Sequence, residues 1–343
     1  MPEPFRVGVT RDFLKPDGTP GFGDIGLDLL ASRPNLDWEY LPENHDELPP
    51  NVSRDYDALL VLAPRVTAAT LSGGERLSII ARFGVGYDRV DVPACTERDV
   101  LLTIAPDGVR RPVAASAVAL VLALAHKLPE KDRLTRAGRW HDKLDYMGMG
   151  LTGRTLGLIG LGNIGREICR LIRPFDMQIA AFDPYASAAA ADEVGARLMQ
   201  LDELLAASDF VCITCALTPE THHLLDARRL ALLKPTAYLV NVARGPIVDQ
   251  RALTGTLTAR RIAGAALDVF EKEPIDTDDP LLSLDNVIFS PHAVCWTDEL
   301  LLGNGRSACR SILEVAAGRL PQLVVNRELL NHPGLETKLR RYR

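Results

Sequence analysis

The stretch Thr155-Leu-Gly-Leu-Ile159-Gly160-Leu161-Gly162-Asn163-Ile164-Gly165 runs from a short apolar segment into a loop rich in glycine. The segment Thr155–Ile159 has the length and composition of a buried strand, and the glycines after it fit the pattern G-x-G-x-x-G. Apolar residues then recur at helical spacing from Ile164 to Ile172. A strand, a glycine turn and a helix in this order are typical of the first unit of a dinucleotide-binding fold.

Each part of this loop has its own expected contact with a dinucleotide. Gly160 would make the tight turn, Gly162 would let the backbone approach a pyrophosphate, and Gly165 would let the helix pack on the strand. The helix begins near Asn163 and Ile164, where free N–H groups and the positive dipole end favour phosphate. We predict that these five residues bind the cofactor.

An acidic residue follows at the spacing expected for ribose recognition. The next predicted strand ends in Phe182-Asp183-Pro184, and Asp183 lies eighteen positions after Gly165 (183 − 165), close to the ~20 of the dinucleotide fingerprint. A carboxylate there accepts both ribose hydroxyls of NAD and repels the extra phosphate of NADP. We therefore predict NAD as the cofactor, with Asp183 on its ribose.

Short apolar runs alternate with helical stretches along the chain, which predicts an α/β fold with parallel sheets. Six strand candidates begin with the run before the glycine loop: Thr155–Ile159, Gln178–Phe182, Phe210–Ile213, Ala237–Asn241, Gly264–Leu267 and Val287–Ser290. Four more precede it: Phe5–Thr10, Ala58–Leu62, Leu77–Ala81 and Val100–Ile104. The six predict a Rossmann-type doubly wound sheet, and the four predict a second, smaller α/β domain.

The sequence changes character at Arg111-Pro112. Pro112 suits the first turn of a helix, and Val113–His126 is apolar on nearly every side, which predicts a helix buried all round, between domains or between subunits. Another helix is expected from about Asp298 to Gly318. We predict a substrate domain that begins with residues 1–108, a dinucleotide-binding domain of residues 109–294, and a helix and tail, residues 295–343, that return to the substrate domain.

The composition is that of a soluble globular protein, with 47% hydrophobic and 24% charged residues. A net charge of −6 gives no overall attraction to nucleic acid or to an anionic membrane. The longest apolar run, Val113–Ala125, is shorter than the ~20 residues that span a bilayer, and Met1–Pro4 lacks the features of a signal peptide. We predict a cytoplasmic protein with neither nucleic-acid nor membrane partners.

The paired cysteines and histidines do not predict a metal site. Cys212 and Cys215 are three apart on a predicted strand, so their side chains point to opposite faces and cannot easily share an ion. Adjacent residues such as His222 and His223 rarely share one either. The six cysteines are expected to stay reduced, with Cys212 and Cys215 as buried apolar filler.

Three segments at the ends of neighbouring predicted strands carry charged or titratable side chains. Arg244 follows the fourth strand of the larger domain, Glu271 and Glu273 follow the fifth, and His292 comes after the sixth. Residues at the carboxyl ends of strands line the ligand crevice of an open α/β sheet. A lone histidine there is more often structural. Because Arg244 and Glu273 follow the neighbouring strands in the same way as His292, the three residues together favour a catalytic set.

These segments, in this order behind the glycine loop, resemble the D-isomer-specific 2-hydroxyacid dehydrogenase family, from about Ile79 to Pro321. In that family an arginine, a glutamate directly before a proline, and a histidine after a proline act together. The resemblance therefore implies Arg244, Glu273 and His292 as the catalytic residues. Glu273 is preferred to Glu271 because a proline follows it directly.

The chemistry of these side chains fits the reduction of a keto acid, in which the developing alkoxide needs a proton while a hydride arrives from the nicotinamide. Histidine titrates near neutral pH, so His292 can give that proton and take it back. Glu273 would orient the ring and stabilise the imidazolium. The planar guanidinium of Arg244 would pair with the substrate carboxylate and polarise the carbonyl.

The resemblance also implies cofactor contacts and an assembly. Asp268 would meet the nicotinamide carboxamide, and Thr221 and Ala243 would line the cofactor as well. The smaller domain is expected to be flavodoxin-like. The protein is expected to be a homodimer with the helix at Val113–His126 in its interface.

The chain departs from the family pattern around the substrate. Backbone N–H groups of Val85 and Gly86 are implied to bind the substrate carboxylate. After His292, where the family commonly has Ile-Gly/Ala-Gly, this chain has Ala293-Val-Cys-Trp296, and Ser116 stands near a position where the family often has glutamate or histidine. Trp296 is expected to face the substrate pocket or the partner domain, where it would narrow the pocket or stack on the substrate.

These features predict an oxidoreductase that transfers a hydride between NAD(H) and a small D-2-hydroxy acid or 2-keto acid of the glyoxylate or hydroxypyruvate kind. The alternative is a non-catalytic, NAD(H)-sensing regulatory scaffold of the co-repressor type. That class of relative can retain the whole catalytic set, so turnover is the property that distinguishes the two.

Overall fold

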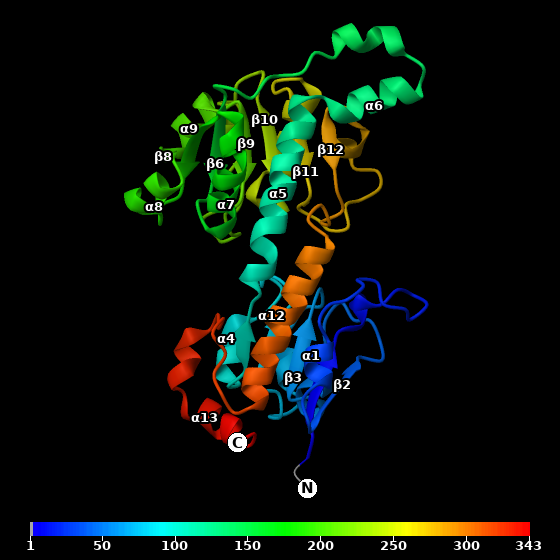
Figure 1. The fold of residues 1–343 in the computed structure, drawn as a ribbon, viewed down its shortest axis with the longest axis vertical. Coiled ribbons are helices and arrows are strands. Elements are labelled where there is room, and N and C mark those ends of the chain that lie inside the picture. The colour runs from blue at the N-terminus through cyan, green and yellow to red at the C-terminus, as the bar shows by residue number, and fades with distance from the viewer. Residues whose placement is uncertain (1–2) are drawn as a thin grey trace. The chain divides into compact units, whose positions relative to one another are not determined.

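The computed structural model describes residues 3–343 as an α/β chain with two compact units, each built around its own parallel sheet (Figure 1). The first unit comprises Met1–Val109 and Trp296–Arg343, and the second comprises Arg110–Cys295. Both divisions fall one residue later than the sequence suggests.

The second unit contains a doubly wound sheet of seven parallel strands in the order β12-β11-β10-β9-β6-β7-β8. The strands are β6 (Thr155–Ile159), β7 (Gln178–Phe182), β8 (Ala196–Leu198), β9 (Phe210–Ile213), β10 (Tyr238–Asn241), β11 (Gly264–Leu267) and β12 (Val287–Phe289). The helices are α6 (Leu128–Arg136), α7 (Asn163–Ile172), α8 (Ala188–Glu193), α9 (Leu201–Ala207), α10 (Ala227–Leu230) and α11 (Gln250–Thr258), with 3-10 turns η2 (Trp140–Asp145), η3 (Arg173–Phe175), η4 (Gly245–Ile247) and η5 (Pro280–Ser283). The chain winds outward in both directions from the β6–β9 pair, which is the Rossmann arrangement.

The first unit contains five parallel strands in the order β2-β1-β3-β4-β5, the flavodoxin-like order. The strands are β1 (Phe5–Val9), β2 (Leu36–Tyr40), β3 (Ala58–Val61), β4 (Ile79–Arg82) and β5 (Leu101–Thr103). The helices are α1 (Asp28–Ala31), α2 (Asn51–Asp55), α3 (Ala68–Leu71), α4 (Val92–Glu97), α12 (Asp298–Ala316) and α13 (Pro333–Arg340), with 3-10 turns η1 (Arg11–Phe13) and η6 (Arg327–Asn331). The predicted fold class is therefore confirmed.

Two edge strands, β2 and β8, were not predicted. In β2 the buried Leu36 is followed by exposed Asp37 and Glu39, so the strand has no continuous apolar run. The strand β8 is only 3 residues long. The larger sheet accordingly has seven strands where the sequence predicts six.

The long helix α5 (Pro106–Ala125) corrects the expected position of the start of this helix. It begins at Pro106, so Pro112 lies in its interior and not in its first turn. Within one chain, Ala115 and Ala119 of this helix are exposed, so burial on every side would require a second subunit. Within the described residues it is the one helix long and apolar enough to cross a membrane, but 67% of its apolar window is buried inside the structure, as in a core helix.

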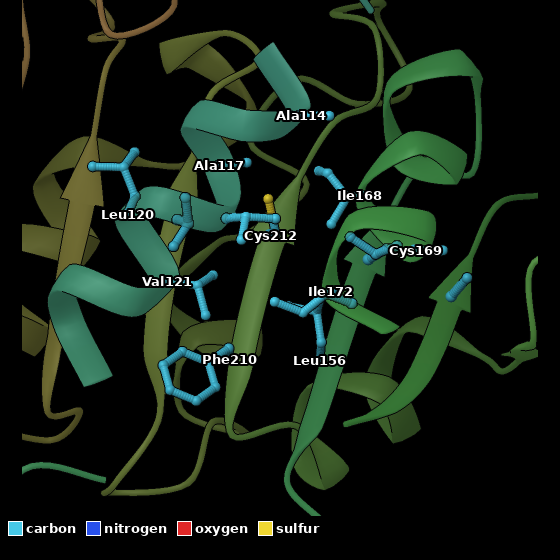
Figure 2. Packing of buried hydrophobic residues seen from close by; sticks show 14 of the residues in the cluster. Ala114, Ala117, Leu120, Val121, Leu156, Ile168, Cys169, Ile172, Phe210 and Cys212 are labelled. Carbon is cyan, nitrogen blue, oxygen red and sulfur yellow. The ribbon is translucent and has the colours of Figure 1, made fainter. Parts of the chain in front are cut away.

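The core of the second unit lies on both faces of its sheet. On one face, α5 and α7 pack against the central strands (Figure 2). The residues that meet there include Ala114, Ala117, Leu120 and Val121 from α5, Leu156, Phe210 and Cys212 from the strands, and Ile168, Cys169 and Ile172 from α7. This packing anchors α7 with its first turn at the end of β6, where the glycine loop lies.

Candidate active site

The carboxyl ends of five strands of the second unit lie in one row. Ile159 pairs with Ile213, Asn241 pairs with both Ile213 and Leu267, and Leu267 pairs with Phe289. The loops after β6, β9, β10, β11 and β12 therefore leave the same edge of the sheet. Open α/β sheets bind their ligands at this edge.

The glycine loop has a shape that fits a dinucleotide. Gly160 has a φ of +101°, and a Cβ there would lie 2.7 Å from the backbone nitrogen of Cys215. A Cβ on Gly165 would lie 2.3 Å from the carbonyl oxygen of Gly160, so α7 can approach the loop this closely only with glycine there. Gly162 faces open space, with nothing within 4 Å of a Cβ, directly before Asn163, the first residue of α7. The open backbone at this helix N-terminus suits a pyrophosphate.

Asp183 lies at the end of β7, beside the glycine loop. Its Oδ2 accepts the N–H of Leu161 at 2.8 Å, and its Oδ1 accepts the N–H of Tyr185 at 2.9 Å. These two bonds fix the carboxylate against the loop. Each oxygen has a further lone pair, so the group can also accept hydrogen bonds from ribose hydroxyls.

Thr221 and Ala243 lie in the loops that follow β9 and β10. The Thr221 hydroxyl donates to the carbonyl oxygen of Ala216 at 2.7 Å and accepts the N–H of Thr218 at 2.7 Å. The N–H of Ala243 donates to Asn241 Oδ1 at 3.0 Å. Both residues therefore belong to hydrogen-bonded loops at the ligand edge of the sheet.

His292 and Glu273 form a hydrogen-bonded pair. His292 Nδ1 lies 2.8 Å from Glu273 Oε2, and Glu273 Oε1 accepts the N–H of Phe270 at 3.0 Å. Partial burial raises the pKa of the Glu273 carboxyl, but the hydrogen bond and charge of His292 outweigh it, helped by the Phe270 N–H and the charge of Arg244. The net effect holds this pKa below its ordinary value, so the carboxylate stays charged beside the imidazole.

The neighbouring acid, Glu271, has different partners. Its Oε1 lies 2.8 Å from His223 Nε2 and accepts the N–H of Gln250 at 3.0 Å. Of the two glutamates that the sequence offers, the structure brings Glu273 to His292.

Arg244 is the N-cap residue of η4 and lies three positions after Asn241, the last residue of β10. Asn241 Nδ2 donates to its carbonyl oxygen at 2.9 Å, and its own Nη1 donates to the carbonyl oxygen of Ala243 at 2.7 Å. The side chain is half-buried, and its charge contributes to the lowered pKa of Glu273. The three residues of the predicted catalytic set thus come together at one edge of the second unit.

Asp268 holds the backbone around His292. Its main-chain carbonyl accepts the N–H of His292 at 2.8 Å, and its Oδ1 accepts the N–H groups of Ala293 and Val294 at 2.9 and 3.0 Å. From α5, Ser116 Oγ donates to the carbonyl oxygen of Val294 at 2.9 Å. Burial raises the pKa of the Asp268 carboxyl, although the Val294 N–H opposes that rise. From the sequence, Asp268 was predicted only to contact the cofactor, and no role was predicted for Ser116. The one feature of the sequence that draws attention to Ser116 is that the family often has glutamate or histidine near this position.

The predicted substrate residues Val85, Gly86 and Trp296 belong to the first unit. Val85 and Gly86 follow β4 in a half-buried loop, which Gly84 enters with a φ of +138°. Trp296 is 50% exposed, and its ring centroid lies 4.8 Å from that of Phe22. Phe22 was not singled out from the sequence, because nothing local links it to a residue so distant in the chain.

A sequence profile decides the family. The profile described as D-isomer specific 2-hydroxyacid dehydrogenase, NAD binding domain, matches residues 118–293, just over half of the chain. The chain belongs to the D-isomer specific 2-hydroxyacid dehydrogenase family. It is an NAD-dependent D-2-hydroxyacid dehydrogenase, with NAD as its cofactor.

Relatives extend the similarity over the whole dehydrogenase. A glyoxylate reductase of Thermococcus onnurineus (strain NA1) is 40% identical over 321 residues, which are 91% of this chain and 96% of that protein. A D-3-phosphoglycerate dehydrogenase of Archaeoglobus fulgidus is 39% identical over 82% of this chain, an alignment that spans only 52% of its own length. The crystal structure of TT0316 protein from Thermus thermophilus has a TM-score of 0.81 at 31% identity, covering 94% of this chain and 100% of that one.

An apolar cavity of about 450 Å³ borders the His292–Glu273 pair of the dehydrogenase within the second unit. Its apolar walls come from the loop after β11, from η5 and from β12 and the residues after it: Phe270, Pro274, Ile275, Leu282, Phe289 and Pro291. One side of the pair therefore faces an apolar surface. The side chains of His292 and Glu273 remain 45% and 36% exposed, so both are accessible to a substrate.

The side chains of the two cysteines and the two histidines pack against other parts of the dehydrogenase or against each other. Cys212 lies in the core on one face of the larger sheet, whereas Cys215 packs against the core on the other. Burial raises the pKa of the Cys212 thiol to about 12. The rings of His222 and His223 stack with centroids 4.1 Å apart. Within residues 3–343, no group of three or more His, Cys, Asp and Glu side chains has the arrangement of a metal site.

Proposed function

We propose that this dehydrogenase reduces small 2-keto acids of the glyoxylate or hydroxypyruvate kind to D-2-hydroxy acids and catalyses the reverse oxidation, with His292 as general acid and base. The observation that carries the proposal is the 2.8 Å hydrogen bond between His292 Nδ1 and Glu273 Oε2. Because Nδ1 is bonded to the carboxylate, Nε2 is the nitrogen that exchanges a proton with the substrate oxygen. Relatives named glyoxylate reductase support the substrate class.

The other site residues hold the reactants. Arg244 pairs with the substrate carboxylate through its planar guanidinium and polarises the keto group, and the N–H groups of Val85 and Gly86 bind the same carboxylate. Glu273 stabilises the imidazolium that remains when substrate oxidation delivers a proton to His292.

The geometry of the proposed cofactor residues supports their assignment to NAD. The open backbone at Gly162, the free N-terminus of α7 and the carboxylate of Asp183 beside them offer partners for a pyrophosphate and a ribose. Thr221, Ala243 and Asp268 complete the proposed cofactor set, and Asp268 also fixes the main chain of His292. Bound NAD(H) supplies or accepts the hydride.

A panel of 2-keto acids, monitored by NADH absorbance, tests this function. We expect NADH oxidation with glyoxylate or hydroxypyruvate. If no acid in a broad panel is turned over at high enzyme concentration, the enzymatic proposal fails, and the non-catalytic NAD(H)-sensing scaffold becomes the better account.

Replacing Asp183 with alanine is expected to relax the preference for NADH over NADPH. The change removes the acceptor of the ribose hydroxyls and the charge that repels a 2′-phosphate, and a hydrogen bond to a charged group contributes ~1.5–3 kcal/mol, or roughly tenfold or more in affinity. The measurement is kcat/KM with each cofactor. Asp183→Asn is the control, because its amide oxygen can still accept the Leu161 N–H. A wild type that already favours NADPH contradicts the assignment.

We also propose that the dehydrogenase is a cytoplasmic homodimer. The exposed Ala115 and Ala119 of α5 are followed in the same unit by Trp140, Leu144 and Met147, which are 62%, 77% and 75% exposed. Large apolar side chains left in water support an interface with a second copy. Light scattering should give a particle mass twice that of one chain. The variant Leu144→Glu should shift the measured mass toward that of one chain. A wild-type protein that is monomeric at micromolar concentration would contradict the dimer. Fractionation of expressing cells tests the compartment.

A further inference from the structure

The second unit contains another pair of histidine and glutamate at the edge of the sheet where the catalytic set lies. His223 Nε2 lies 2.8 Å from Glu271 Oε1, and the two side chains are 39% and 34% exposed. His223 lies in the loop after β9, and Glu271 lies in the loop after β11, two positions before Glu273. A half-exposed pair of this kind adds little to stability, so its main effect comes through the loops that it joins.

Glu271 is also held by the segment that follows β10. Its Oε1 accepts the N–H of Gln250 at 3.0 Å, and its own N–H donates to Gln250 Oε1 at 3.1 Å. His223 joins the same segment through its main chain, since its N–H donates to the carbonyl oxygen of Pro246 at 2.8 Å. His223, Gln250 and Glu271 therefore form a clasp that ties together the segments after β9, β10 and β11.

The clasp is continuous with the main chain that holds Glu273. The Glu271 N–H is bonded to Gln250. The preceding N–H, that of Phe270, donates to Glu273 Oε1 at 3.0 Å. Glu273 Oε2 lies 2.8 Å from His292 Nδ1, so a shift of this stretch of main chain would move the carboxylate relative to the imidazole.

The segment that carries Arg244 packs on the same stretch of main chain. A Cβ on the next residue, Gly245, would lie 1.9 Å from the carbonyl carbon of Phe270 and 2.4 Å from the nitrogen of Glu271. Because close-packed atoms leave no room for separate movement, the two segments shift together or not at all. The clasp thus holds one block of main chain that carries both Arg244 and Glu273.

We propose that His223 and Glu271 are positioning residues for the proton transfer, because their clasp holds Glu273 against His292. The proposal rests on the proposed function and assigns a role to the glutamate that lies outside the catalytic set. The charges that act on Glu273 are those of His292 and Arg244, and the charge of His292 also acts on Asp268. Loss of the clasp weakens the stabilisation of the imidazolium by Glu273 and removes no group that touches the reactants.

Glu271→Ala tests the clasp, with kcat for glyoxylate measured at saturating NADH over a range of pH. A misplacement of 1 Å can cost about 10²-fold in rate, so kcat should fall roughly 10- to 100-fold. Because an opposite charge at close range shifts a titration by about 1–3 units, a partly displaced Glu273 should move the alkaline limb of the kcat profile to lower pH by roughly 0.5–1 unit. NADH affinity should stay close to wild type, since Thr221 keeps the hydrogen bonds within its own loop.

Two further variants separate the geometry of the clasp from its charge. Glu271→Gln keeps an oxygen that can accept hydrogen bonds from Gln250 and His223, so kcat and the alkaline limb should stay close to wild type. His223→Asn should change both in the direction of Glu271→Ala but less, because Gln250 still holds Glu271. His223 has a φ of +49°, which asparagine tolerates, so this variant decides the question if thermal unfolding shows that Glu271→Ala is not folded.

The matched control is a half-exposed pair of histidine and acid in the first unit. His332 Nδ1 lies 3.2 Å from Asp99 Oδ1, and His332 is the N-cap of α13, a position that suits asparagine. His332→Asn should therefore leave both kcat and the alkaline limb unchanged.

The outcomes separate the positioning role from the function on which it rests. An unmoved alkaline limb in Glu271→Ala, with or without a lower kcat, overturns the positioning role alone. So does a loss of NADH affinity as large as the loss of kcat, because the clasp would then support the cofactor loops. An equal loss in Glu271→Gln would mean that the charge of Glu271 acts directly, which overturns it too. A wild type that reduces neither glyoxylate nor any other 2-keto acid overturns the proposed function and the positioning role together.

Discussion

Replacing His292 with asparagine is expected to lower kcat for 2-keto acid reduction by roughly 10²–10⁴-fold, the usual contribution of a general acid, while NADH affinity stays within about threefold of wild type. Asparagine suits this position because His292 has a φ of +54°, in the left-handed region that asparagine tolerates better than most residues. Its main-chain N–H can still donate to the carbonyl oxygen of Asp268. Steady-state turnover and a fluorescence titration with NADH measure the two effects separately.

Glu273→Gln is the companion variant, and its effect should be smaller. The amide oxygen can still accept a hydrogen bond from His292 Nδ1–H, but the charge that stabilises the imidazolium is lost. The pKa of Glu273 is lowered in the folded protein. The His292–Glu273 pair therefore stabilises the fold at pH values above the ordinary pKa of a glutamate, and this stabilisation is lost as the pH falls through the lowered pKa. The difference in unfolding temperature between wild type and Glu273→Gln should therefore shrink on acidification.

A different pattern of losses would contradict the catalytic assignment. If His292→Asn abolished NADH binding, His292 would be part of the cofactor site or of the local fold. If it left kcat unchanged, another group would be the proton donor, and the hydrogen bond between His292 and Glu273 would be structural.

The features that the sequence predicts well are those that depend on neighbouring residues. The strand, glycine turn and helix from Thr155 to Ile172 form one local unit, and each step has its own residue preference. The choice of Glu273 over Glu271 came from the proline that follows it, through the family resemblance, and the structure places Glu273 beside His292. Ser116 and Phe22 had no such signal, since their partners Val294 and Trp296 lie 178 and 274 (296 − 22) positions away.

The helix α5 shows a second limit of local rules. Pro106 and Pro112 both suit the first turn of a helix, and the sequence alone gives no reason to choose the earlier one. The exposure of Ala115 and Ala119 depends on which face packs against the sheet. In a run that is apolar on nearly every side, periodicity cannot identify that face.

Replacing Gly165 with alanine is expected to destabilise the second unit by about 1–3 kcal/mol, the usual cost of overpacking a close-packed site. The new Cβ would lie 2.3 Å from the carbonyl oxygen of Gly160. Gly160 cannot move aside easily, because its N–H donates to the carbonyl oxygen of Phe182 at 2.8 Å and its carbonyl oxygen accepts the Thr214 hydroxyl at 2.8 Å. The first turn of α7 would have to shift away from the loop, so NADH affinity should fall at least roughly tenfold through weakened charge-assisted hydrogen bonds to the pyrophosphate. Urea unfolding and NADH titration measure the two losses.

Gly162→Ala separates cofactor contact from packing, because the fold itself leaves room for a side chain there. A Cβ on Gly162 meets nothing within 4 Å, and the residue has an ordinary φ of −71°. Stability should therefore be unchanged, while NADH affinity falls because the methyl group occupies the space through which the pyrophosphate approaches the backbone. Gly255→Ala is the matched control: it is equally open, lies in α11 away from the loop, and should leave affinity unchanged while stabilising the helix by up to ~1 kcal/mol. A Gly162→Ala variant that binds NADH as tightly as wild type would place the cofactor elsewhere.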